Sequence, residues 1–408
     1  MLLLTLAAAA LLQVPQLAPA GPGMSHNPPS PALGVNTRNV FLVMIDGLRW
    51  QEVFTGADER LIHKDYGVSD DARVRHDYWR DAPAERRKAL MPFVWSTIAD
   101  PTTGGQIRGN LFAHSSATLT NGFKVSYPGY SEVFCGFPQE GIKDNKKIWN
   151  PSPTVFEALN AKPEFASKVA AFGAWDLFPW IFNTERCGFP VDDGLKPIDF
   201  GKTNEAITTA NALRVQVPRR WSGSSFDALL FRPAFEWVKL NKPRVAFIGL
   251  GETDEWAHEN KYGQYLDAAH RADGYIKELW DWCQATDGYK GCTSIIITCD
   301  HGRGGDNAPG YETAGGQLKQ WTDHGAKIVA AEQTWIIVMG PDTPAKGELT
   351  DAPAVTQSQI ASTMAALLGV DYPAQQPKAA PPITGAIGKP GTSRPSPAQP
   401  ISAPAATR

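Results

Sequence analysis

The sequence predicts an α/β fold in which helices cover both faces of a doubly wound, mostly parallel sheet. Short runs rich in β-branched residues recur along the chain, and they are apolar at successive positions, which is typical of strands buried on both faces. Stretches with helical periodicity separate these runs. Alternation of strand and helix predicts this architecture, with inserted loops and small subdomain elements between the repeating units.

The order of these elements can be read along the chain. We expect buried parallel strands at Val40–Ile45, Val169–Phe172, Arg244–Leu250, Ser294–Thr298 and Thr334–Met339. The helical stretches include 225–240, 263–282 and 357–368. No internal repeat and no long linker divides residues 37–373, so we predict a single domain there.

The two ends of the chain have a different composition. Residues 1–20, MLLLTLAAAALLQVPQLAPA, combine an apolar run with an Ala-Pro-Ala step, which is typical of a secretory signal peptide. Residues 21–36 and 374–408 are rich in Pro, Ala, Gly and Ser, and predict a flexible segment and a disordered tail. No later stretch reaches the ~20 apolar residues of a membrane-spanning helix. We therefore expect a periplasmic or secreted protein with no transmembrane anchor after signal cleavage.

Charge and cysteine content exclude several classes of protein. The 408 residues carry a net charge of −3, with 42% apolar and 20% charged residues, so neither a polybasic binder of nucleic-acid polymers nor an acidic disordered chain is expected. Five cysteines are too few for a disulfide scaffold. Cys283 and Cys292 could close a short loop, Cys135 could pair with Cys187, and Cys299 is expected to be a buried thiol.

Acidic residues and histidines follow several predicted strands. In a doubly wound sheet, ligands bind where the strands end, so these side chains are expected to converge. Two of them, Asp254 and His258, are four residues apart and would share one face of a helix. The complete set is Asp46, Asp254, His258, Asp300, His301 and His324.

This set of three carboxylates and three imidazoles predicts a site for two divalent ions. Each motif alone is ambiguous, because Asp-Gly often forms an ordinary turn. The mixed ligand types suit zinc, our first choice, and also manganese or iron, better than calcium. Two metals close together serve phosphoryl transfer. We therefore expect a metal-dependent phosphoric ester hydrolase.

A nucleophile for this chemistry is expected in the segment KVSYPGYSE, residues 124–132. Pro128-Gly129 would turn the chain, and a helix could then begin with its amides facing an anion. Ser126 is our candidate nucleophile. Spacing alone leaves Ser131 as an alternative.

The ordered motifs VMIDG, VSYPGYSEVFCG, GETDEWAH, TCDHG and TDHG resemble those of the alkaline phosphatase superfamily, in particular its type I phosphodiesterase/nucleotide pyrophosphatase branch. The resemblance covers most of residues 37–372. It implies that one ion is held by Asp254, His258 and His324, and the second by Asp46, Asp300 and His301. It also implies that Ser126 bridges the two ions.

Two further segments bear on this resemblance. The branch usually has Thr-Phe-Pro-Asn-His-Tyr where this chain has Ser-Tyr-Pro-Gly-Tyr-Ser, so the hydroxyl is kept. The segment Gly-Ile-Lys-Asp-Asn resembles one in which an Asn binds a phosphoryl oxygen, which implies this role for Asn145; a surface turn is the alternative. The lysines at 124, 143, 146 and 147 could add positive charge, but no group is assigned to the extra charge of a monoester.

The expected function is therefore that of an exported dimetal hydrolase that cleaves a small-molecule phosphodiester or nucleotide pyrophosphate through a phosphoseryl intermediate. The alternatives are a phosphomonoesterase, a phosphoglycerate mutase-like enzyme and a non-catalytic binding protein. A sulfatase would need a Cys-x-Pro-x-Arg-like turn, a pattern that Cys-Gly-Phe-Pro-Gln at 135–139 lacks. The aromatic residues Trp50, Tyr127, Tyr130, Trp175 and Trp180 could stack on a substrate, although we expect most of them to pack in the core.

Overall fold

The computed structural model describes residues 35–306 and 309–388. The predicted signal peptide, the flexible segment up to residue 34 and the tail beyond residue 388 lie outside the described residues. Within the described ranges, no helix is both long and apolar enough to cross a membrane.

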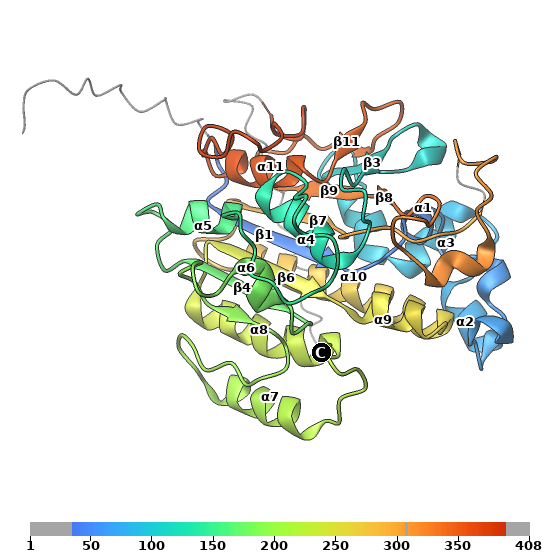
Figure 1. Cartoon of the computed structure of the whole chain (residues 1–408), viewed down its shortest axis with the longest axis horizontal. Helices are drawn as coiled ribbons and strands as arrows, with labels where there is room; N and C mark the ends of the chain where they lie inside the picture. Colours follow the sequence, from blue (N-terminus) through green and yellow to red (C-terminus); the bar gives the residue numbers. More distant parts are fainter. Residues whose placement is uncertain (1–34, 307–308, 389–408) are drawn as a thin grey trace, which may run out of the picture. The chain divides into compact units, whose positions relative to one another are not determined.

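Strand β1 (Asn39–Ile45) lies inside an eight-stranded sheet, between β6 (Val245–Leu250) and β7 (Thr293–Thr298), and is parallel to both (Figure 1). Beyond β6, β4 (Val169–Gly173) and β5 (Val191–Asp192) continue the sheet in parallel. The strand order is β10-β2-β9-β7-β1-β6-β4-β5. This mostly parallel sheet flanked by helices confirms the predicted fold class.

The other edge of the sheet differs from the prediction. Strand β9 (Ile336–Met339) is antiparallel to β7 and to β2 (Gln106–Arg108), which pairs with β10 (Gly347–Glu348). The predicted strand Thr334–Met339 was therefore wrong in direction, because a strand buried on both faces has the same composition in either direction. It is also interrupted: β8 (Gln333–Thr334) joins β3 (Ala117–Thr118) and β11 (Val355–Thr356) in a separate small sheet.

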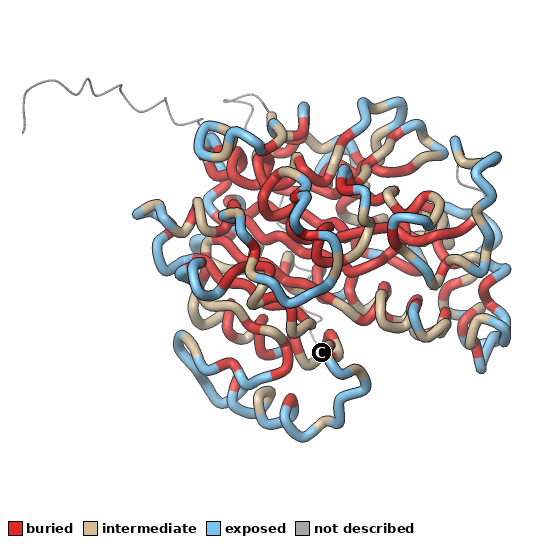
Figure 2. The backbone as a smooth tube through the Cα atoms, in the orientation of Figure 1, coloured by how far each residue is buried: buried red, intermediate tan, exposed pale blue. Residues whose placement is uncertain are grey.

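Alternate residues of β1 pack in two hydrophobic cores, one on each face of the sheet. The odd-numbered residues from Phe41 to Ile45 pack in one core and the even-numbered residues from Val40 to Met44 in the other. Figure 2 shows the sheet buried and the exposed residues concentrated in outer loops and helix faces. This two-sided burial explains why the strands are apolar at every position.

Helices supply the outer layers of both cores. The first core includes residues of α1 (Trp50–Thr55), α3 (Pro83–Leu90), α8 (Asp227–Asn241) and α10 (Tyr262–Ala285). The second includes residues of α4 (Ser126–Cys135), α5 (Val155–Asn160), α6 (Phe178–Phe182) and α11 (Gln359–Leu367). Helices α8, α10 and α11 correspond to the three predicted helical stretches.

Shorter elements complete the described chain. The remaining α-helices are α2 (Asp71–Tyr78), α7 (Glu205–Gln216) and α9 (Glu252–His258). Short 3-10 helices occupy Glu59–Leu61, Lys64–Tyr66, Leu111–Ala113 and Leu318–Thr322, and a π-helical turn spans Val94–Ile98.

Residues 374–388 differ from the disordered tail that their composition predicted. Ala379, Ile383 and Ala386 are buried in the core that contains α4 and α11. The amide of Ala380 donates to the carbonyl of Gly136 at 2.8 Å. A few small apolar residues between prolines are thus enough to pack this segment against the domain, which extends beyond residue 373.

All five cysteines are free and buried. Neither candidate pair, Cys283 with Cys292 or Cys135 with Cys187, forms a disulfide in the structure. Cys299 is a fully buried thiol, as expected. Burial raises the pKa of Cys135 to about 12, so this thiol is protonated and unreactive at neutral pH.

Candidate metal centre and active site

The parallel strands β1, β6 and β7 bring three of the sequence motifs to one edge of the sheet. Asp46 directly follows β1, and Asp300 lies just after β7. The Gly47 amide donates to Asp300 Oδ1 at 3.0 Å, which joins the two strand ends. The third motif follows β6 in α9, where Asp254 and His258 share a helix face as predicted, with Asp254 Oδ2 3.2 Å from His258 Nε2.

One group of possible metal ligands consists of Asp46, Asp300 and His301, whose ligand atoms all lie within 4.8 Å of one another. His301 Nε2 is 3.5 Å from Asp46 Oδ1 and 3.4 Å from Asp300 Oδ2. Both of these carboxylate oxygens are buried and have no hydrogen-bond donor. Buried, unsatisfied carboxylate oxygens that face an imidazole fit a divalent cation, which would compensate their charge.

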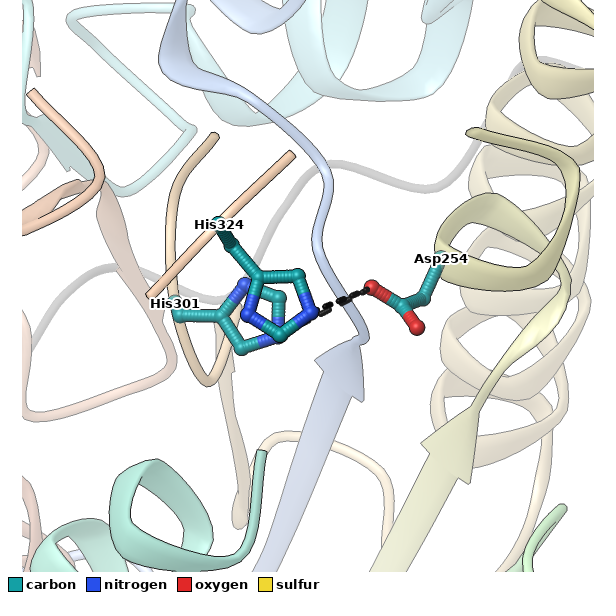
Figure 3. A group of neighbouring side chains, drawn as sticks. All are labelled: Asp254, His301 and His324. Carbon is teal, nitrogen blue, oxygen red and sulfur yellow. Dashed lines mark ion pairs between the residues drawn. The ribbon is translucent and has the colours of Figure 1, made fainter. Parts of the chain in front are cut away.

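A second group consists of Asp254, His301 and His324, shown in Figure 3. The two imidazole rings stack with centroids 3.9 Å apart, and Asp254 Oδ1 lies 3.7 Å from His301 Nε2 and 3.9 Å from His324 Nε2. His258 adjoins this group, since its Nε2 is 3.1 Å from His324 Nε2. His301, predicted to serve only the other ion, belongs to both groups.

The electrostatics of the two groups support the same interpretation. Burial, together with repulsion from Asp254, raises the pKa of Asp300 to about 7, and burial with repulsion from Asp300 raises the pKa of Asp46 well above its usual value. Burial also lowers the pKa of His301 well below its usual value and that of His324 to about 4. Neutral imidazoles are the ligand form of histidine, and a cation would relieve the repulsion between the carboxylates.

Arg303 is a residue of this site that sequence reasoning missed. It is fully buried, and its guanidinium donates to the Asp254 carboxylate and, at 3.1 Å, to the Asp254 carbonyl. Although burial opposes ionisation, Arg303 and then His258 hold the pKa of Asp254 well below its usual range. Its position two residues after His301, in the same loop, was the available signal.

Ser126 begins helix α4, and its Oγ lies 3.3 Å from His301 Nε2. The helix was expected to follow Pro128-Gly129, but both residues are inside it. Gly129 packs so tightly that a Cβ there would lie 2.2 Å from the Asp300 carbonyl oxygen. The absence of a side chain at Gly129 therefore allows α4 to bring Ser126 to the ligands.

Ser131 lies elsewhere on the same helix. It is fully buried, and its Oγ accepts hydrogen bonds from the side chains of Gln139 and Asn150, the latter at 3.4 Å. It belongs to a polar network in the core. Of the two serines that spacing alone could not distinguish, only Ser126 lies beside the predicted ligands.

Asn145 lies beside the start of α4. Its Oδ1 accepts a hydrogen bond from the Tyr127 amide at 2.9 Å, which fixes the side chain next to Ser126. Both residues line a cavity of about 210 Å³ that extends from Asp46 and Asp254 over the ends of β4 and β6. Asn145 is exposed, as the surface-turn alternative expects, but it also lines this cavity.

The lysines and most of the aromatic residues that the sequence suggested as substrate contacts do not line this cavity. None of its lining residues is a lysine or arginine. Three of the four candidate lysines, Lys124, Lys146 and Lys147, form ion pairs with Glu332, Asp144 and Asp176. The aromatic residues Trp50 and Tyr127 are fully buried in the core, and Trp180 stacks on Trp149.

Two of the aromatic residues do reach the cavity. Tyr130 donates its hydroxyl hydrogen to Asp46 Oδ2 at 3.0 Å, so it positions a predicted metal ligand. Trp175 also lines the cavity and is half-buried. These placements could not be read from the sequence, in which all 13 tryptophans look alike.

This fold and arrangement of ligands define a hydrolase of the alkaline phosphatase superfamily, and solved structures share the fold. The alkaline phosphatase PafA aligns with a TM-score of 0.54 at 12% identity, covering 86% of this chain and 99% of its own. The lipoteichoic acid synthase LtaP from Listeria monocytogenes has a TM-score of 0.50 at 13% identity, with 91% of this chain and 78% of that chain covered. A 2-O GAG sulfatase also scores 0.50 at 13% identity, with coverages of 88% and 76%. Similarity at these identities shows the fold alone.

The family is identified by sequence. The family model for type I phosphodiesterase / nucleotide pyrophosphatase matches residues 118–369, and the chain belongs to this family. The matched region contains the candidate nucleophile and all the candidate ligands except Asp46. No curated protein sequence matches the chain significantly.

Proposed function

We propose that this hydrolase is an exported enzyme that cleaves phosphodiesters through a phosphoseryl intermediate on Ser126. The observation that carries the proposal is the position of the Ser126 hydroxyl. It lies at the start of α4, 3.3 Å from the imidazole that joins two groups of carboxylate and histidine ligands. Export rests on the predicted signal peptide.

Two divalent ions, zinc in the first instance, fit the two ligand groups. Asp46, Asp300 and His301 would hold one ion, and Asp254, His258 and His324 the other. The unsatisfied buried oxygens of Asp46 and Asp300 support this assignment. When bound, such ions favour ionisation of the nucleophile and neutralise charge on the phosphoryl group and the departing oxygen.

The residues of the chain then divide the reaction into two displacements. Ser126 Oγ loses its proton to solvent and forms a bond to phosphorus while the bond to the first alcohol breaks, and the alcohol leaves with a proton from solvent. Water then attacks the phosphoseryl group, which releases a phosphate monoester and restores the hydroxyl. The Asn145 side chain, which lies beside the start of α4 and lines the cavity, is positioned to hold a non-bridging oxygen in both steps.

The composition of the cavity favours diesters. A monoester dianion carries one more negative charge than a diester, and binding it calls for an additional positive group. No lysine or arginine lines the cavity, and the nearby Lys147 is already paired with Asp176 at 2.7 Å. The phosphomonoesterase alternative would need a cation from elsewhere.

The sulfatase alternative is disfavoured by geometry as well as by motif. Cys135, the cysteine in the turn considered for that chemistry, is the last residue of α4 and is fully buried. The same helix places Ser126 beside the ligands, at its opposite end. A non-catalytic binding protein is disfavoured because the chain retains the full set of candidate ligands around a hydroxyl.

The proposal is tested by comparing hydrolysis of bis-p-nitrophenyl phosphate and p-nitrophenyl phosphate by the purified protein supplied with zinc or manganese. We expect faster cleavage of the diester and loss of activity after treatment with EDTA. A preference for the monoester would move the enzyme to the phosphomonoesterases. Protein that binds no metal and cleaves neither compound would support the binding-protein alternative.

A further inference from the structure

We infer that the cavity wall formed by Trp175, Ser224 and Glu255 is a subsite for a cationic alcohol substituent, so that the preferred substrate is a phosphodiester of a small ammonium or quaternary ammonium alcohol. This inference rests on the proposed function, since it names the substrate class of the same site. The three residues line the cavity together with Ser126 and Asp254.

The wall is built by two chain segments that lie side by side. Trp175 and Ser224 form an antiparallel bridge, the Asp176 amide donates to the Gly223 carbonyl at 2.9 Å, and the Ser225 amide donates to the Ala174 carbonyl at 3.0 Å. This pairing holds Trp175 and Ser224 at the end of the sheet. The Trp175 ring also packs perpendicular to Phe178, which fixes its orientation.

Glu255 enters the same wall from helix α9. The start of this helix is fixed by Asp227, whose Oδ1 accepts the Gly251 amide at 2.7 Å. Glu255 and Ser224 line the same part of the chain's cavity as Trp175, so the helix and the paired segments contribute to one wall. An acidic group and an aromatic ring therefore share a half-buried surface next to the candidate nucleophile.

The charge of this wall selects among substituents. Within the described residues, no lysine, arginine or histidine nitrogen forms an ion pair with Glu255, in contrast to the neighbouring Glu252 and Glu259, which pair with Arg271 and Arg220. An unpaired carboxylate beside an indole attracts an organic cation through charge and cation–π contact. The same carboxylate repels the additional phosphates of a nucleoside polyphosphate.

The orientation of the aromatic rings also disfavours a nucleobase in this position. A stacking slot needs parallel flat surfaces on the two sides of the base, whereas the three aromatic residues of the lining pack edge to face, with Phe178 at 90° to Trp175 and at 73° to Tyr130. An indole and a carboxylate in one small cavity suit a compact cation better than a planar base.

Two p-nitrophenyl diesters that share a leaving group test the inference. One is p-nitrophenyl phosphorylcholine, and the other is its uncharged isostere, the p-nitrophenyl ester of 3,3-dimethylbutyl phosphate. For the zinc-supplied protein, we expect kcat/KM to favour the choline ester by about tenfold, the size of a partly desolvated cation–π and charge contact. A ratio of one, or a preference for p-nitrophenyl thymidine 5′-phosphate over the choline ester, would overturn the inference.

Variants locate the effect within the wall. We expect Glu255→Gln and Trp175→Leu each to lower the choline-to-isostere ratio severalfold. Glu259→Gln is the matched control. It removes the same charge at a position one helical turn from Glu255, and Glu259 does not line the cavity. An equal fall in the ratio for Glu259→Gln would mean that the general field, and not this wall, selects the cation.

Failure of the proposed function is distinguished by a binding measurement that needs no turnover. Calorimetric titration of the Ser126→Ala protein with each diester should show tighter binding of the choline ester. If the zinc-supplied wild type hydrolyses neither diester but Ser126→Ala still binds the choline ester more tightly, the subsite stands and the proposed reaction fails. If the wild type hydrolyses both diesters and Ser126→Ala binds them equally tightly, the reaction stands and the subsite is wrong.

Discussion

The ligand groups at the ends of β1, β6 and β7 and the Trp175 wall of the same cavity are built in different ways. Most of the ligands come from short motifs that follow parallel strands, and Asp46, Asp300 and His301 are buried within 4.8 Å of one another. The wall comes from two connecting segments and one helix face, and its residues Trp175 and Glu255 are half-buried. Chemistry and selectivity are therefore carried by separable parts of one cavity.

This difference predicts how substitutions in each part will act. A change among the ligands or at α4 should alter the reaction itself, whatever the substrate. A change in the wall should alter the ratio between substrates. The largest effects are expected among the ligands and the residues that position them.

The largest effect is expected for Ser126→Ala. Removal of the nucleophile should lower kcat on a phosphodiester by at least about a thousandfold. The control is Ser131→Ala, which loses buried hydrogen bonds and about 1–3 kcal/mol of stability but should keep its kcat. Steady-state kinetics and thermal unfolding of both variants provide the test. Normal turnover by Ser126→Ala, or loss of turnover only in Ser131→Ala, would exclude Ser126.

Asn145→Ala should have the next largest effect. Removal of one preorganised hydrogen-bond donor to a developing oxyanion lowers kcat by about a hundredfold. Asp144→Ala is the matched control, because Asp144 is in the same turn but pairs with Lys146. Equal activity of the two variants would identify the segment as an ordinary surface turn.

Gly129→Ala should destabilise the protein by about 1–3 kcal/mol, because the new Cβ would overlap the Asp300 carbonyl. The shift of α4 should also reduce kcat. Gly274→Ala, in open space on α10, should instead stabilise the protein by up to about 1 kcal/mol through helix propensity. Similar melting temperatures for the two variants would show that α4 does not need this close approach.

The smallest effect concerns pH and the metal-free protein. The pKa of Asp300 is raised to about 7 in the folded state, which therefore favours the protonated carboxyl. The stability that this protonation contributes is fully present below the ordinary pKa of 3.8. That contribution is lost as the pH rises through about 7. Metal-free Asp300→Asn should therefore become more stable than metal-free wild type between pH 5 and pH 8, as measured by thermal unfolding.

A second comparison isolates this effect. The lowered pKa of His324, about 4, acts in the opposite direction, since it favours the folded state as the pH rises through 4 to 6.5. His324 is present in both proteins and cancels in the difference. Zinc at pH 8 should stabilise wild type more than Asp300→Asn. A pH-independent difference between the two metal-free proteins would contradict the raised pKa.

The sequence carried most of the information about the sheet and the ligands. Residues after β1, β6 and β7 could be grouped because parallel strands end at one edge. The direction of β9 could not be obtained in this way, since it is apolar on both faces in either direction. Residues 374–388 were also beyond reach, because their packing depends on a few contacts with α4 and α11 that composition does not reveal.

By itself, the sequence determined the fold class, the family motifs and the six candidate ligands, because strand exits and short motifs are local patterns. Only the tertiary structure decided that His301 belongs to both ligand groups, that Ser131 lies in a polar network in the core, and that Arg303 pairs with Asp254. The physical reason is that these relations join residues far apart in the chain. Their distances depend on close packing, such as that of Gly129 against Asp300, which no local pattern encodes.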